Sequence, residues 1–145
     1  NPSDARFKNN IKANVPGLEF ITKLQPVTYL FDTKKLETFT KTGKLENTQF
    51  TFASNNPASQ KLHTGFLAQD VEKIAKQLGY DFDGVNAPAD NKGYYTLGYS
   101  QFVVPLVQAV KEQQIQIEEQ KNENDTLKKQ LQLLLERIEK LEKQK

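Results

Sequence analysis

The sequence from residue 99 to residue 145 reads YSQFVVPLVQAVKEQQIQIEEQKNENDTLKKQLQLLLERIEKLEKQK, and it decides the fold of the chain. Apolar and amide side chains recur along it at the a and d positions of a seven-residue repeat, in one register to the end. Such a repeat forms a seam that a lone helix cannot bury, so it predicts a coiled coil. The a positions are Val103, Val110, Ile117, Asn124, Leu131, Ile138 and Lys145, and the d positions are Leu106, Gln113, Gln120, Leu127, Leu134 and Leu141.

Charges and amides beside the seam also favour a coiled coil. Glu123 at a g position can pair with Lys128 at an e position of a neighbouring helix. The amides in the middle of the seam must pair with each other or with water, which lowers stability but fixes register and stoichiometry. β-branched residues at a with leucine at d favour a parallel dimer, whereas Leu131 at a and glutamine at d weaken that preference. The pattern therefore leaves stoichiometry open, and the alternative is a long solvated helix packed on its own domain.

Composition limits the classes of function. The chain has 145 residues and a net charge of +2, so no basic surface favours nucleic acid. It has no cysteine and one histidine, His63, so we expect no disulfide, metal site or cofactor. No stretch is apolar enough to span a membrane. The absence of methionine, including at position 1, predicts a fragment of a longer protein, whose compartment the fragment does not reveal.

Residues 1–98 predict a small α+β core of about 100 residues, followed by a coiled-coil stalk at residues 99–145. We expect short helices at residues 18–24 and 68–78, the second ended by Gly79, and strands at residues 27–31, 62–67 and 94–97. Residues 34–60 predict a protruding arm or loop, with a helical turn at Leu36 and Phe39 and a short strand at residues 49–52. Residues 81–91 predict an acidic loop whose spacing does not fit a calcium loop.

Ser3 and Lys8 form the first candidate site. A neutral lysine can take the proton of a serine hydroxyl and so generate a nucleophile without histidine. Five residues along a helix turn a side chain by about 140°, and odd spacing along a strand places two residues on opposite faces. A bend or a neighbouring subunit must therefore bring the two together. The plainer interpretation is a surface lysine and a serine that caps a helical turn, with Asp4 in that turn.

Two further places carry candidate residues. His63 lies beside an expected core strand, where a lone histidine is usually a hydrogen-bonded structural residue. Gly65 and Gln69 bound a strand-to-helix junction whose backbone N–H groups can hold an oxyanion. Such a junction is also how any strand enters any helix, so alone it indicates no chemistry.

Four blocks of sequence resemble, in the same order, the intramolecular chaperone of endosialidases and phage tail fibres, the peptidase S74 family. The first, residues 3–11, is similar to its opening Ser-Asp-x-Arg-x-Lys-x-x-Ile. The later blocks are LQPVTY at residues 24–29, GFLAQDVE at residues 65–72 and YSQFVVPL at residues 99–106. The coiled coil resembles the family as well, whereas residues 34–59 match least.

The resemblance implies a homotrimer assembled through the C-terminal helix, which assists the folding of a preceding β-rich fibre or secreted domain in the same chain. It implies a virion tail, secreted or cell-surface location. It further implies that the chain is a single-turnover serine endopeptidase that cuts the Pro2–Ser3 bond. Ser3 would be the nucleophile and Lys8 its general base. The supporting residues would be Asp4, Arg6, His63, Gly65 and Gln69.

Two functions from different classes remain open at this point. A self-cleaving chaperone needs Ser3 beside a buried Lys8, and Ser3→Ala should leave a longer product. A trimerisation module without cleavage needs only the seam, and Ser3→Ala should change nothing. Pro2 bears on the choice, because its fixed φ can hinder transfer of the acyl group.

Overall fold

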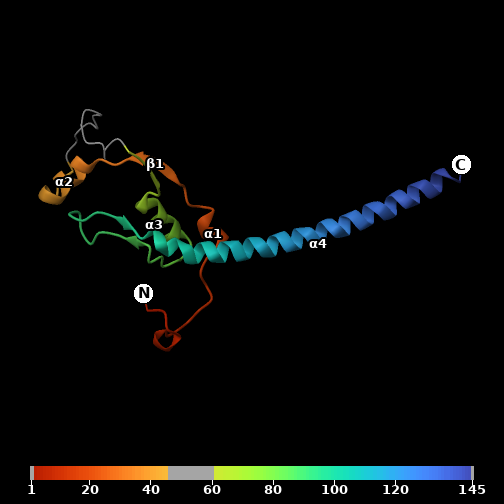
Figure 1. Cartoon of the computed structure of the whole chain (residues 1–145), viewed down its shortest axis with the longest axis horizontal. Helices are drawn as coiled ribbons and strands as arrows, with labels where there is room; N and C mark the ends of the chain where they lie inside the picture. Colours follow the sequence, from red (N-terminus) through yellow and green to blue (C-terminus); the bar gives the residue numbers. More distant parts are fainter. Residues whose placement is uncertain (1, 46–60, 145) are drawn as a thin grey trace.

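The computed structural model describes residues 2–45 and 61–144, and it shows a small mixed core from which one long helix projects (Figure 1). Helices and strands alternate without a large sheet, so the expected α+β class is confirmed. In chain order the elements are η1 (Ala5–Phe7), α1 (Leu18–Ile21), β1 (Val27–Leu30), α2 (Thr33–Thr42), β2 (Leu62–Gly65), α3 (Ala68–Gln77), β3 (Val85–Asn86), β4 (Thr96–Leu97), η3 (Tyr99–Phe102) and α4 (Val103–Glu142).

The strands of the described residues form two separate antiparallel ribbons. β1 pairs with β2, with Val27 opposite Gly65 and Leu30 opposite Leu62. β3 pairs with β4 over two residues each. The first two expected strands are therefore confirmed, but the expected strand at residues 94–97 shrinks to its second half. Its partner β3 lies within residues 81–91, the segment expected to form a loop. The sequence does not reveal this strand, because two residues are too few to show an alternating pattern.

α3 and α2 differ in how well the sequence marks them. α3 ends as expected at Gly79, whose φ of 62° is left-handed and suits a residue without a Cβ. α2 is a ten-residue helix, longer than the expected single turn. The Asp32 side chain caps it by accepting a hydrogen bond of 2.9 Å from the Lys35 N–H, and Gly43 ends it at a φ of 66°. The strand expected at residues 49–52 lies outside the described residues.

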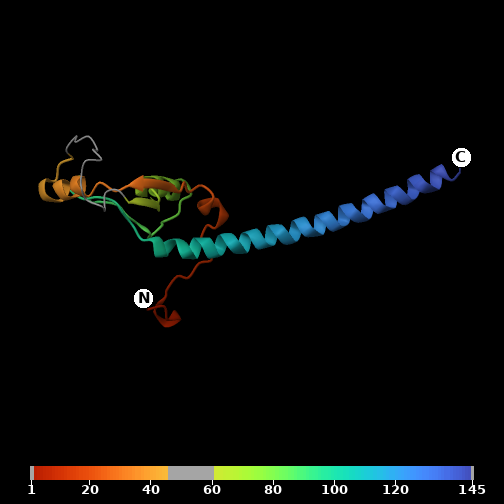
Figure 2. The same cartoon turned by 45° about the horizontal axis from the view of Figure 1, so that its top comes forward.

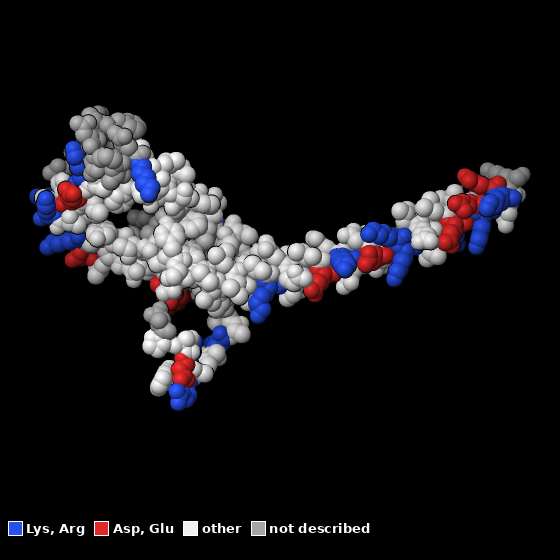
Figure 3. Space-filling model, viewed as in Figure 1, with Lys and Arg blue, Asp and Glu red and all other residues white. Residues whose placement is uncertain are grey.

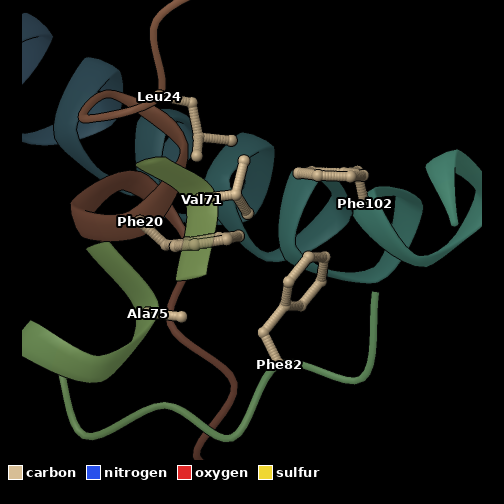
Figure 4. Close-up of a cluster of buried hydrophobic side chains, with 6 residues drawn as sticks. All are labelled: Phe20, Leu24, Val71, Ala75, Phe82 and Phe102. Carbon is tan, nitrogen blue, oxygen red and sulfur yellow. The ribbon is translucent and has the colours of Figure 1, made fainter. Parts of the chain in front are cut away.

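The core is an aromatic cluster built from segments far apart in the sequence. Phe20 of α1 is fully buried, with Phe82 at 5.0 Å and Phe102 at 6.4 Å between ring centroids. Val71 and Ala75 of α3 close the cluster from another side (Figure 4). Three of the buried side chains, Leu24, Val71 and Ala75, lie at the helical spacings expected from the sequence, whereas Phe20 lies outside the apolar positions expected for the first helix.

The first turns of α4 belong to this core. Pro105 and Ala109 are buried, and Glu112 is half-buried at its contact with α1. Pro105 lies in the first turn, where its missing N–H breaks no helical hydrogen bond. Every described residue after Glu112 is exposed in the single chain. The helix has 40 residues and so extends about 60 Å, most of it beyond the core (Figure 2).

Candidate functional site

The N-terminal arm, residues 2–16, carries the first candidate site on the short turn η1. The Asp4 carboxylate accepts a hydrogen bond of 2.9 Å from the Arg6 N–H and so caps this turn. The expectation that Ser3 is the cap is therefore wrong. Both side chains are suited to capping, but only Asp4 lies directly before the helical residues, and Ser3 is free for another contact.

Asp4 and Arg6 also form an ion pair across the turn. Nη2 of Arg6 lies 2.6 Å from Oδ2 of Asp4, and Nε donates to both carboxylate oxygens at 3.0 and 3.1 Å. This pairing lowers the pKa of Asp4 and raises the pKa of Arg6. Because both side chains are exposed, the pair orients the turn more than it stabilises the fold.

Ser3 and Lys8 lie together at the ends of the same turn. Lys8 Nζ donates a hydrogen bond of 2.8 Å to Ser3 Oγ. η1 supplies the bend that neither a regular helix nor a strand provides at this spacing, and the Lys8 N–H closes it on the Ala5 carbonyl at 3.1 Å. Both side chains are exposed in the single chain, whereas burial is what favours the neutral form of an amine. The geometry of a serine–lysine pair is present without the enclosure that would activate it.

The strand-to-helix junction is already bonded by a residue that the sequence did not single out. The Tyr99 hydroxyl accepts a hydrogen bond of 3.1 Å from the Phe66 N–H. Gly65 is buried beneath Tyr99, and a Cβ on Gly65 would collide with that hydroxyl. Tyr99 belongs to one of the sequence blocks that resemble the family. Only the fold brings it to Phe66, which lies 33 residues earlier in the chain. In this chain the Phe66 N–H is engaged and does not point to an open oxyanion site.

The remaining candidates lie on the core and not on the arm. The His63 ring stacks on Tyr29 with 5.6 Å between centroids, consistent with a structural histidine. Gln69 is exposed at the start of α3 and lines a shallow apolar pocket of about 460 Å³ with Asp32 and Tyr94. Figures 1 and 2 show the arm and the β1–β2 ribbon on opposite sides of α4. One chain therefore brings Ser3, Asp4, Arg6 and Lys8 together but keeps His63, Gly65 and Gln69 apart from them.

The described residues contain neither a cluster of metal-ligating side chains nor a membrane-spanning helix. No group of three or more acidic or histidine side chains in residues 2–45 and 61–144 is arranged to hold a metal ion. Among the helices of these same segments, none is both long and apolar enough to cross a bilayer.

Comparison with known proteins identifies the chain through its family. No curated protein and no solved structure matches it significantly. The model of one family, the chaperone of endosialidase, matches residues 3–80, which is more than half of the chain. The match begins at Ser3 and includes the arm, both strands of the first ribbon and α3. The chain therefore belongs to the endosialidase chaperone family.

Proposed function

We propose that the chain is a C-terminal intramolecular chaperone that trimerises through α4 and assists folding of a preceding fibre-like or secreted domain. It then releases itself by cutting Pro2–Ser3. Membership in the family supports the chaperone role. The 2.8 Å contact between Ser3 Oγ and Lys8 Nζ is the observation that carries the proposed cleavage.

The exposed seam supports assembly through α4. Its apolar side chains are 45–65% exposed in the single chain, although all of them are leucine, isoleucine or valine. Burial against neighbouring helices would remove this surface from water. The seam residues are Val103, Leu106, Val110, Ile117, Asn124, Leu127, Leu131, Leu134, Ile138 and Leu141. The proposed division is a core at residues 1–98, with residues 34–60 as a protruding arm or loop, and a stalk at residues 99–145.

Cleavage would proceed by transfer of an acyl group within the chain. Neutral Lys8 accepts the hydroxyl proton of Ser3, and Ser3 Oγ attacks the carbonyl carbon of Pro2. The bond from that carbon to the Ser3 nitrogen breaks, and Lys8 returns the proton to the nitrogen as it leaves. The product is an ester and a free α-amino group. Water then hydrolyses the ester, which leaves a carboxylate on Pro2 and restores the Ser3 hydroxyl.

The enclosure that this chemistry needs would come from a neighbouring subunit. Lys8 is exposed within its own chain, and the N-terminal arm lies across α4 from the junction between β2 and α3 (Figure 1). His63, Gly65 and Gln69 could therefore support Ser3 only from another copy. Such an arrangement would hold cleavage back until the subunits have assembled.

The test is the intact mass of a longer chain that carries its natural upstream sequence, or a trimeric β-fibre domain fused ahead of Asn1. The parent is compared with Ser3→Ala and Lys8→Met, and Lys12→Met serves as a control because Lys12 is an exposed lysine of the same arm. The proposal predicts two fragments from the parent and from Lys12→Met, with the second fragment beginning at Ser3. It predicts one uncut chain from Ser3→Ala and from Lys8→Met.

One uncut chain from the parent would overturn cleavage. If that uncut chain is still a trimer by light scattering, the alternative function remains, a trimerisation and folding module without peptidase activity. A monomeric parent would overturn assembly as well.

A further inference from the structure

An exposed aromatic patch lies on one face of the β1–β2 ribbon. Tyr29 and His63 are directly opposite each other in the ribbon and stack at 5.6 Å. A Cβ on Gly65, two residues from His63, would meet both the Tyr99 hydroxyl and the Tyr29 ring, so Tyr99 borders the same face. Leu67 continues the alternation in extended backbone. We call Tyr29, His63, Leu67 and Tyr99 the ribbon patch.

The ribbon patch is apolar and open to solvent. Tyr29, Leu67 and Tyr99 are 36%, 52% and 50% exposed, and the patch contains no Asp, Glu, Lys or Arg. A two-stranded ribbon is marginal in water without a cover, and the opposite face of this one is also exposed at Leu62 and Thr64. In Figure 3 charges gather on the α2 end, the arm and the stalk, whereas the middle of the visible face is uncharged.

The patch is continuous with the seam of α4. Tyr99 is the first residue of η3, the 3-10 turn that leads directly into α4. Val103 and Leu106, the first a and d residues of the seam, are also about half exposed. In a parallel coiled coil, equivalent a and d residues of all chains meet in layers around the axis. Since η3 leads directly into α4 and the Tyr99 hydroxyl bonds the Phe66 N–H next to β2, a trimer formed through the seam would bring the ribbon close to a second copy.

We propose that the ribbon patch is a contact between subunits that extends the seam from the stalk into the core. This inference rests on the proposed trimer, and its occupant is a second copy of the chain. Two contacts of Tyr99 support this inference. Its ring stacks on Phe66 and its hydroxyl accepts a hydrogen bond from the Phe66 N–H, so the side chain is not free to fold inward.

The test compares subunit dissociation of the parent, the double variant Tyr29→Lys with Leu67→Lys, and Tyr94→Lys. Tyr94 is a matched control because it is a tyrosine with 51% exposure that lines the pocket beside α2. The dissociation constant of the assembly, measured by sedimentation equilibrium, should be higher for the patch variant than for the parent by on the order of tenfold or more. The reason is that a charged amine is costly to bury unpaired. The control should dissociate as the parent does.

A second comparison separates assembly from folding. Leu127→Asp with Leu134→Asp should give a monomer without touching the core, since both residues lie far out on the stalk. In that monomer the lysines of the patch variant should lower the urea midpoint no more than Tyr29→Ala does, because Tyr29→Ala removes the contact between Tyr29 and His63 within the chain. A larger fall would overturn the inference, because the patch would then stabilise its own chain.

The absence of cysteine provides an independent readout. Tyr99→Cys should form disulfide-linked dimers on mild oxidation, whereas Tyr94→Cys should not. A trimeric parent whose patch variant dissociates like the control would overturn the patch and leave the proposed trimer intact. A monomeric parent would overturn both.

Discussion

The backbone N–H of Leu18 donates a hydrogen bond of 2.7 Å to the carboxylate of Glu112, although the two residues are 94 positions apart. Gly17 lies so close to α4 that a Cβ there would come within 2.6 Å of the Ala109 nitrogen. Gln108 donates to the other carboxylate oxygen of Glu112 at 2.9 Å. α1 is thus bonded directly to the first turns of α4, and the joint fixes where the N-terminal arm leaves the core.

Removing this carboxylate should loosen the joint. We expect Glu112→Ala to lower the urea midpoint of unfolding, because the Leu18 N–H would lose a charged acceptor. Glu118→Ala is the control, since Glu118 accepts a similar bond of 2.8 Å from Gln114 on the exposed stalk and contacts no other element. Equal midpoints for the two variants would show that the joint contributes nothing.

Acid should weaken the same joint. The Gln108 side chain, followed by the Leu18 and Gly17 N–H groups, lowers the pKa of Glu112 below its ordinary value. A carboxyl whose pKa is lower when folded stabilises above its unfolded pKa of about 4.3, and this stabilisation is lost as pH falls through the folded pKa. The midpoint of the parent should therefore fall more steeply below about pH 5 than that of Glu112→Ala. Parallel pH profiles would contradict this assignment, since other carboxyls are common to both proteins.

Gly17 should tolerate no side chain. Gly17→Ala must push α1 off the α4 backbone, which we expect to reduce the free energy of unfolding by about 1–3 kcal/mol. At Gly98 the nearest atom to a Cβ is a flexible side-chain carbon at 3.4 Å, and φ is −89°. Gly98→Ala should therefore leave stability unchanged or raise it by about 0.4–1 kcal/mol. Chemical denaturation of both variants tests the contrast in sign.

Phe20 should be the most sensitive core position. Its ring is fully buried among aromatic neighbours, so Phe20→Ala should reduce the free energy of unfolding by about 3–5 kcal/mol. Phe7 on the arm is 75% exposed, and Phe7→Ala should change it by less than about 0.5 kcal/mol. Comparable losses in denaturant titrations would mean that the arm is packed in solution as tightly as α1.

Asn124 should lower the thermal stability of the assembled stalk and at the same time define its number of chains. Asn124→Ile should raise the melting temperature of the assembled stalk and broaden its distribution of oligomers, because a buried amide at an a position specifies stoichiometry. Asn122→Ile, at an outward f position, should do neither. Native mass spectrometry and thermal melts check both effects. A single unchanged oligomer in Asn124→Ile would remove that role from Asn124.

How far the sequence predicts the fold depends on the length of each pattern. α4 and α3 repeat over enough residues to show their period, and Gly79 marks the end of α3 by its backbone requirement. β3 and β4 are too short for any period. α2 has both a capping aspartate and a terminal glycine, but few apolar residues face the core, so its pattern is weak.

The candidate site was predictable in its residues and not in its contacts. Spacing alone places Ser3 and Lys8 on different sides of a regular helix or strand. Their contact depends on a short turn capped by Asp4, and the sequence does not decide between Ser3 and Asp4 as the cap. The bond from Phe66 to Tyr99 is set by tertiary packing, which no local pattern encodes.

The last segment of the core to be synthesised is also one that closes it. Phe102, Pro105 and Ala109 are buried against segments near the start of the chain. Translation runs from the N-terminus at about 5–20 residues per second, so Phe20 is synthesised several seconds before Phe102. The aromatic cluster can form only after the ribosome has passed Phe102. Folding of this domain therefore has to wait for synthesis of the first turns of α4, and the proposed assembly through that helix would come later still.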